Sequence, residues 1–177
     1  MKDGRRQQAI KALKDWDRLK QKGIWISGVE GEGLYKKWRT DGQLYISAYY
    51  KNGELDGEYK QWWENGNYRV IAHYKNGKLD GEYKEWHKNG NPWTIAYYKN
   101  DKLDGEYKEW WKNGTFYEKS YYKNDKLDGE YRRWWDSGQL YILSYYKNDK
   151  LDGEYKEWDA NGKLVKHAYY KNGKELK

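Results

Sequence analysis

The chain repeats itself every 24 residues, and this period constrains its fold more than any other feature. The segment LDGEYKEW stands at residues 79–86 and returns unchanged at 103–110 and 151–158, with close variants at 55–62 and 127–134. A unit this short cannot bury one of its faces alone, so it gains stability from neighbouring copies. The period therefore predicts a stack of small, similar units in place of one globular core.

Each unit carries the same residues at fixed positions, counted from its first glycine. Position 3 is always Tyr, position 6 Trp, position 10 Gly and position 18 Tyr, while position 16 is always Ala or Ser. The shared aromatic columns are expected to build the scaffold, and the small residue at position 16 predicts that a bulky side chain leans over it. The six units begin at Gly33, Gly57, Gly81, Gly105, Gly129 and Gly153.

Turn signals divide each unit into two short strands. An NG, DG or SG pair comes first and a KNG or KND triplet follows, which is the chemistry of hairpin turns. Asn, Asp and Gly tolerate the positive φ of such turns, and Tyr, Trp, Thr and Ile favour strands. We therefore predict an all-β fold, a single-layer meander of repeated β-hairpins with about twelve antiparallel strands over residues 33–174.

The leading segment has a different pattern. Ile10, Leu13, Trp16 and Leu19 recur every three residues, which places them on one face of a helix. We predict a short N-terminal capping helix over residues 5–21, because the ends of a repeat array need covering. The expected division is a helix and cap at 1–32 and a six-repeat array at 33–177. The alternative is a basic helix that contacts lipid headgroups or nucleic acid.

Composition limits the class of protein and its partners. Charged residues make up 36% of the chain, but 12 Trp and 21 Tyr oppose disorder because aromatic rings bury large areas. Most of the net charge of +7 lies before residue 23, so the repeats are nearly balanced, which disfavours nucleic acid as a partner. No apolar run is long enough for a membrane span or a signal peptide, and a cytoplasmic location is expected.

The repeated motifs G-x-Y-x-x-W-x-x-N-G and Y-Y-K-N-G-K-L-D-G-E resemble MORN repeats (membrane occupation and recognition nexus), in the variant form common in bacteria. The resemblance runs from residue 33 to about residue 174 and implies a twisted single sheet of hairpins that serves as a binding scaffold. Bacterial proteins of this kind are often labelled antitoxins or immunity proteins, and eukaryotic ones are associated with membranes and scaffolding. The family has no shared catalytic residues to transfer.

The residues offer no catalytic constellation and no metal site, so no enzyme activity, metal or cofactor is expected. The chain has no Cys, and its three histidines, His73, His87 and His167, lie in different units. A catalytic triad or a zinc site would need such side chains to converge. Carboxylates that repeat down a sheet among lysines are usually solvated ladders.

Binding residues are sought at the positions where the six copies differ. Positions 7 and 13 flank the first turn, and a two-residue turn would pair position 7 with 12, whereas a three-residue turn would pair it with 13. Their Trp, Tyr and Arg side chains are typical of interface hot spots. The other interpretation is that these rings thicken a thin core. The predicted partner-binding residues are Arg39, Tyr45, Trp63, Arg69, His87, Trp93, Trp111, Tyr117, Trp135 and Tyr141.

The partner predicted from these residues and from the resemblance is another protein, with a bacterial toxin as the specific hypothesis. Two alternatives stay open. Rows of Trp and Tyr also suit glycan or cell-wall binding, and the repeats also suit a membrane surface. Aromatic rings among lysines can stack on single-stranded nucleic acid, but the near-neutral repeats argue against it.

Overall fold

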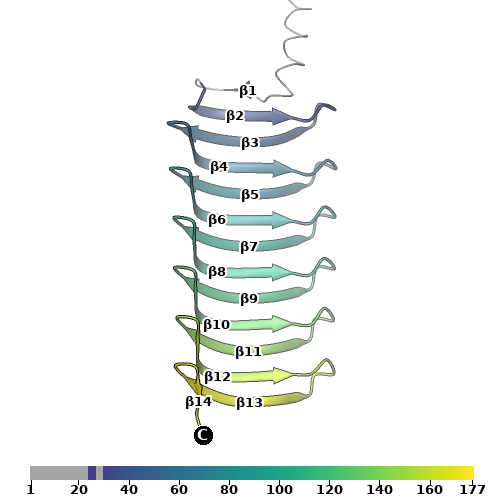
Figure 1. Ribbon diagram of the computed structural model, residues 1–177. Coiled ribbons are helices and arrows are strands. Elements are labelled where there is room, and N and C mark those ends of the chain that lie inside the picture. The colour runs from purple at the N-terminus through teal and green to yellow at the C-terminus, as the bar shows by residue number, and fades with distance from the viewer. Residues whose placement is uncertain (1–23, 27–29) are drawn as a thin grey trace, which may run out of the picture.

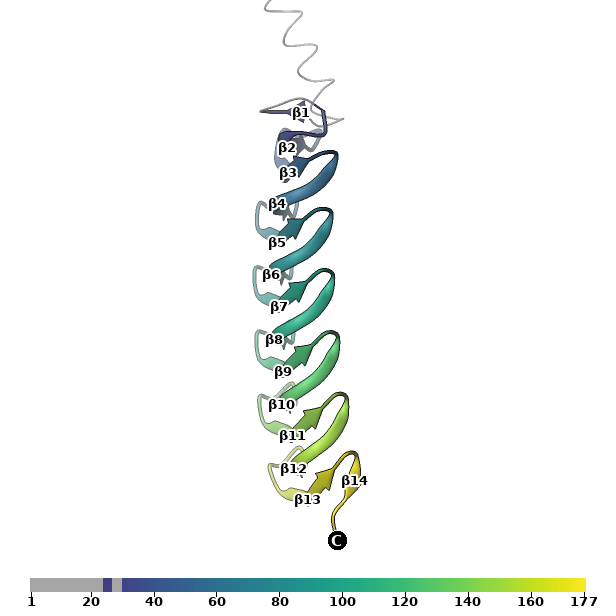
Figure 2. The ribbon, with the colours of Figure 1, turned by 90° about the vertical axis from the view of Figure 1, so that its left-hand side faces the viewer.

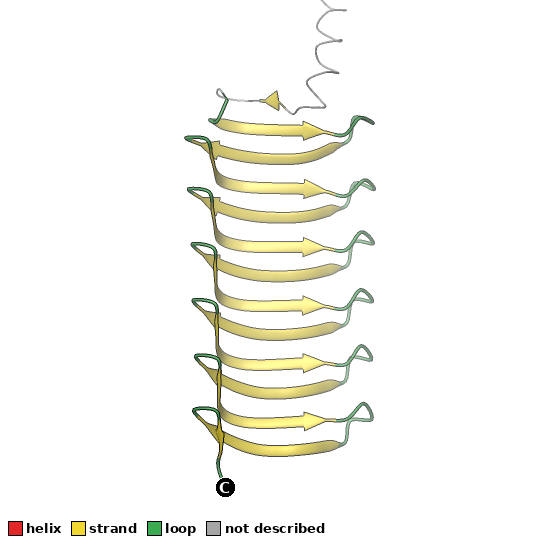
Figure 3. Ribbon diagram, viewed as in Figure 1, coloured by secondary structure: helices red, strands yellow, loops and turns green. Residues whose placement is uncertain are grey.

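The computed structural model describes residues 24–26 and 30–177, and every regular element in this part of the chain is a strand (Figure 3). The helix predicted over residues 5–21 lies outside the described residues.

The first long strand of the sheet has six residues, the later long strands alternate between eight and nine, and the strand at either end of the sheet has two. They are β1 (Ile24–Trp25), β2 (Gly33–Trp38), β3 (Leu44–Lys51), β4 (Glu54–Trp62), β5 (Tyr68–Lys75), β6 (Lys78–Trp86), β7 (Pro92–Lys99), β8 (Lys102–Trp110), β9 (Phe116–Lys123), β10 (Lys126–Trp134), β11 (Leu140–Lys147), β12 (Lys150–Trp158), β13 (Leu164–Lys171) and β14 (Lys174–Glu175).

All fourteen strands form one sheet in sequence order, and each strand is antiparallel to its neighbours (Figure 1). The predicted all-β meander of hairpins is confirmed, with β2 to β13 as its twelve long strands. Short strands extend the sheet at both ends, because Trp25 pairs with Tyr35 and Lys171 with Lys174. Seen from the side, the hairpins follow one another in a narrow single layer (Figure 2).

The alternation of side chains gives the sheet two different faces. Positions 3, 5, 14, 16 and 18 share one face, called here the tyrosine face, where Tyr83 Oη donates to Glu85 Oε2 at 2.9 Å. Positions 2, 4, 6, 12 and 17 share the opposite face, called here the tryptophan face, where Lys84 Nζ lies 2.7 Å from Glu82. Each face therefore has its own columns of aromatic and charged residues.

The most buried residues are the small ones at position 16. Ala72 is fully buried and pairs with Tyr59 on one neighbouring strand and with Tyr83 on the other. The tyrosine rings of positions 3 and 18 also meet edge-on, as Tyr59 and Tyr74 do with centroids 6.0 Å apart. The prediction that a bulky side chain covers position 16 is confirmed. The column consists of Ala48, Ala72, Ala96, Ser120, Ser144 and Ala168.

A glycine bends every second long strand close to its start. Gly105 has a φ of +136°, and the ladder between β7 and β8 shifts register opposite Tyr97. A Cβ atom on Gly105 would lie 2.9 Å from Tyr97 Cβ, so no other residue fits without movement. The first glycine of the repeat thus allows the strand to bend against its neighbour.

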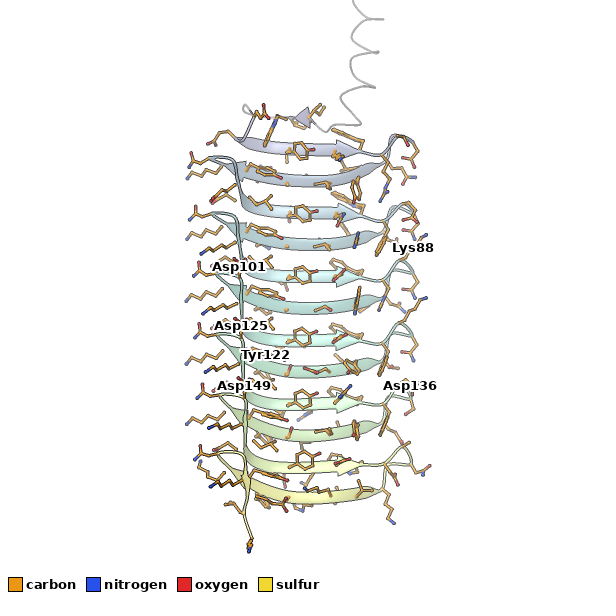
Figure 4. All side chains as sticks on the ribbon, viewed as in Figure 1. Lys88, Asp101, Tyr122, Asp125, Asp136 and Asp149 are labelled. Carbon is orange, nitrogen blue, oxygen red and sulfur yellow. The ribbon has the colours of Figure 1, made fainter. Side chains whose placement is uncertain are left out.

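The second turn of each repeat is tied to the repeat before it. Asn124 and Asp125 form its tip with φ values of 50° and 66°. The Asp125 carboxylate accepts a hydrogen bond from the Leu103 amide at 2.8 Å, and the Asp104 carboxylate accepts one from the Asn124 amide at 3.2 Å. Figure 4 shows Asp101, Asp125 and Asp149 one above another along this edge, with Lys88 and Asp136 at the opposite edge. The repeated LDG segment therefore joins adjacent repeats.

Candidate functional site: a row of ring pairs at positions 7 and 13

The first turn of each hairpin spans three residues and is followed by a bulge. In repeat 4, the Trp111 amide donates to the Thr115 carbonyl at 2.8 Å, and the Gly114 amide donates back to the Trp111 carbonyl at 2.8 Å. Trp110 then faces Phe116 and Glu109 faces Glu118, which leaves Tyr117 as the extra residue of a β-bulge. Position 7 therefore pairs with position 11, and neither pairing considered from the sequence, with 12 or with 13, is found.

The bulge brings the side chains of positions 7 and 13 together within each of the first five repeats. The ring centroids of Trp111 and Tyr117 lie 4.6 Å apart, and those of Trp135 and Tyr141 lie 4.2 Å apart. In the other three repeats the pairs are His87 stacked on Trp93 at 5.1 Å, the Arg39 guanidinium over Tyr45 at 4.4 Å, and the Arg69 guanidinium over Trp63 at 4.7 Å. All ten residues predicted at these positions belong to this ring-pair row.

Two open hollows lie between successive pairs of the ring-pair row. The first, of about 370 Å³, is lined by His87, Trp93, Glu109, Trp110, Trp111, Lys112 and Tyr117. The second, of about 490 Å³, is lined by Trp111, Tyr117, Arg133, Trp134, Trp135, Asp136 and Tyr141. Because Trp111 and Tyr117 line both, their pair separates the two hollows.

Some residues of the ring-pair row also hold the repeats together. Trp63 Nε1 donates to the Trp86 carbonyl of the next repeat at 3.0 Å, and Arg39 Nη2 donates to the Trp62 carbonyl at 3.0 Å. Trp93 and Trp111 nevertheless keep 39% and 37% of their surface exposed. The row therefore contributes to the scaffold, as one interpretation of the sequence expected, and it also presents aromatic surface, while a role in partner binding stays a prediction.

The repeats match a protein-family model described as the MORN repeat variant, at residues 31–52, 55–76, 79–100, 103–124, 127–148 and 151–172. The chain belongs to the MORN repeat variant family. MORN repeats generally mediate binding or scaffolding, and they bind other proteins and membrane lipids. No curated protein matches the chain closely enough to be compared with it.

A charged feature beside the ring-pair row was missed by the comparison of MORN copies in the sequence. Glu109 and Glu118 face each other directly across β8 and β9 on the tyrosine face. Glu109 accepts a hydrogen bond from Tyr107 Oη at 3.0 Å, and Glu118 accepts one from Tyr131 Oη at 3.1 Å. The sequence contains a signal for this pair, because positions 5 and 14 also differ between copies. It does not contain the strand register that places the two positions opposite each other.

Burial is the main influence on the Glu118 carboxyl. It raises the pKa of Glu118, the hydrogen bonds from Ser120 and Tyr131 act in the opposite direction, and the negative charge of Glu109 raises the pKa further. Arg133, the partner of Glu118 on β10, lowers it, but its guanidinium lies over the Tyr117 ring at 4.5 Å and bonds to the Tyr117 hydroxyl. Like charges opposite each other destabilise a sheet, so this pair costs stability in repeat 4.

Residues 24–26 and 30–177 contain no group of three His, Cys, Asp or Glu side chains placed to hold a metal ion. In the same ranges, no helix has the length and apolar character needed to cross a membrane.

Proposed function

We propose that this MORN protein is a non-catalytic binding protein that seats another protein on its tyrosine face, and that it acts as an antitoxin or immunity protein for a protein toxin. The observation that carries the proposal is the ring-pair row, which sets two aromatic hollows beside partly exposed Trp and Tyr rings. Trp, Tyr and Arg dominate the binding energy of interfaces, and hot spots gather in well-packed pockets near the centre.

The tyrosine face is large enough for a stable complex. A standard interface buries roughly 800 Å² per partner. Twelve strands at about 4.8 Å each extend for roughly 58 Å along the array, so the row lies within a surface that can cover a small domain. The hollows occur in repeats 3 to 5, near the middle of this length.

The charges of the tryptophan face favour a protein over a lipid surface or nucleic acid. The lysines of position 4 on the tryptophan face are paired within their own strand, with Lys60, Lys108 and Lys156 at 2.6, 2.5 and 2.8 Å from the glutamates two residues before them. Anionic headgroups and phosphates are bound by unpaired clusters of Lys and Arg. Paired lysines provide little net charge for either ligand.

The test is affinity capture from the native host with the tagged protein and two variants. Trp111→Ala combined with Tyr117→Ala removes the wall shared by both hollows, and Tyr169→Ala removes a ring that is 51% exposed on the tryptophan face. We expect one stoichiometric protein to be retained by the wild type and by Tyr169→Ala and to be lost with the double variant. The captured protein should arrest growth when expressed alone, and co-expression of the wild type should restore growth.

Two outcomes would overturn the proposal. Retention of the partner by the double variant, in a folded state shown by circular dichroism, would remove the ring-pair row from the interface. Binding to glycan, vesicles or oligonucleotides with no protein recovered would replace the proposed partner class.

A further inference from the structure

We propose that the segment seated on the ring-pair row is a proline-rich stretch of the partner in the polyproline II conformation, with prolines at every third residue and a basic residue between two of them. The inference rests on the proposed function, because it takes the ring-pair row as the interface and names the chemistry that fits it.

The spacing of the hollows is the first argument. They flank the same ring pair, Trp111 and Tyr117, so they lie one repeat apart. One repeat adds two strands, which is about 9.6 Å along the array. Three residues of polyproline II advance about 9.3 Å and return to the same side of the helix. Side chains on one side of an extended strand recur every ~6.7 Å, and those of an α-helix at about 6 or 10.5 Å, so both fit the hollows less well.

The walls of the hollows are the second argument. Trp111, Tyr117, Trp135 and Tyr141 surround the second hollow with ring surface. Open grooves of this kind accept proline rings, and a polyproline II segment loses little conformational entropy because it is already extended in solution. Its backbone carbonyls have no internal hydrogen bonds, so the Arg133 guanidinium and the Tyr141 hydroxyl at this hollow can donate to them.

The third argument is charge complementarity between the facing carboxylates of Glu109 and Glu118 and a basic residue of the bound segment. Glu109 lines the first hollow. Glu118 lies opposite Glu109 on β9, the strand that also carries Tyr117. Within residues 24–26 and 30–177, neither carboxylate forms a salt bridge, and the Arg133 guanidinium, which belongs to the residue opposite Glu118 in the ladder between β9 and β10, lies over the Tyr117 ring. Polyproline II has three residues per turn, so the two residues between successive bound prolines project to the sides. A Lys or Arg at one of these places would reach the carboxylates and relieve their mutual repulsion.

The experiment titrates the intact protein with synthetic peptides of one length and one number of prolines, and calorimetry measures the binding. One series places prolines at every second, every third or every fourth residue, and a second series replaces the basic residue with Gln. We expect the every-third peptide with Arg to bind about tenfold more tightly than the other spacings, and the Gln peptide to lose a similar factor.

Variants assign the two parts of the site. Trp111→Ala should remove the dependence on proline spacing, because it opens both hollows, and Trp135→Ala should weaken it by removing one wall. Glu118→Gln should remove the difference between the Arg and Gln peptides. The matched control is Glu157→Gln, since Glu157 also accepts a tyrosine hydroxyl, from Tyr155 at 2.8 Å, but faces Lys166 across the ladder.

Equal binding of all spacings, or tighter binding of the every-second or every-fourth peptide, would overturn the inference. So would an Arg preference that survives Glu118→Gln. If a partner is captured through the ring-pair row while every proline peptide fails to bind, the inference falls and the proposed function stands. If a proline peptide binds but no toxin is captured, the inference stands and the proposed antitoxin function falls.

Discussion

The indole of Trp111 meets the ring of Tyr117 edge-on, with centroids 4.6 Å apart, although the two residues are not partners in the backbone ladder. The bulge at Tyr117 produces this contact, because it inserts one residue between the pairs Trp110–Phe116 and Glu109–Glu118. As a result, Trp110 and Phe116 stack on the tryptophan face while Trp111 and Tyr117 meet on the tyrosine face. Adjacent tryptophans therefore have different neighbours and different expected roles.

The two tryptophans of repeat 4 are expected to differ in their contribution to stability. Trp110 stacks on Phe116 at 5.0 Å, and Phe116 reaches Trp134 of the next repeat at 5.4 Å. Trp110→Ala should lower the free energy of unfolding by about 2–3 kcal/mol, less than a fully buried aromatic residue because the sheet is a single layer. Trp111→Ala should cost about 1 kcal/mol. Urea unfolding followed by circular dichroism measures both, and equal losses would remove the distinction between scaffold and surface rings.

Glycines of the repeat are expected to respond differently to alanine according to their surroundings. At Gly105, φ is +136° and an added Cβ would lie 2.9 Å from Tyr97 Cβ, so Gly105→Ala should destabilise the protein by roughly 3 kcal/mol. The control is Gly66→Ala, where φ is +84° and nothing lies within 4 Å of the added atom. That change should cost about 1 kcal/mol from backbone strain alone. The midpoints of urea unfolding report the difference, and equal costs would show that the contact with Tyr97 is unimportant.

The strand order could be predicted from the sequence because turn residues recur at a fixed period. An NG, DG or SG pair marks the first turn of each repeat and a KNG or KND triplet marks the second, and a repeat with two hairpin turns continues as a meander. The cover over position 16 could also be predicted, since six small residues aligned beside tyrosine columns leave room for rings. These features depend on residue type and spacing, which the sequence gives directly.

The register around the first turn could not be predicted in the same way. Whether position 7 pairs with 11, 12 or 13 depends on the conformation of Gly114 and on the bulge at Tyr117. Both are backbone choices that several turn types satisfy with the same residues. The opposition of Glu109 and Glu118 follows from that register, so the carboxylate pair emerged only from the structure.

The aspartates at the second turn are expected to stabilise the junctions between repeats. Asp125 has a φ of 66°, which is unfavourable for a residue other than Gly, but its carboxylate accepts the Leu103 amide at 2.8 Å. Asp125→Ala should lose the hydrogen bond and keep the strain, at a cost of about 1–2 kcal/mol. Asp125→Gly should cost less, because glycine relieves the strain. Amide hydrogen exchange at Leu103 should increase in both variants, and unchanged exchange would contradict the proposed link.

High pH is expected to unfold the array through its tyrosine columns. Burial raises the pKa of Tyr59 to about 12, from 10.0, and also raises the pKa of the position 3 tyrosines that follow it, Tyr83, Tyr107, Tyr131 and Tyr155. A group whose pKa is higher in the folded state binds its proton more tightly there. Its contribution to stability is complete below about pH 10 and is lost as the pH rises through the folded pKa.

Tyr59→Phe tests this pH dependence with little disturbance at neutral pH, since the substitution keeps the ring that meets Tyr74. The variant should match the wild type at pH 7 and exceed it by about 1 kcal/mol near pH 12, a value reduced for the partial solvent exposure of the ring. Urea unfolding at both pH values measures the change, and the absorbance of phenolate follows ionisation directly. Ionisation of all tyrosines at their ordinary pKa, with no unfolding, would show that the columns do not exclude water as the structure indicates.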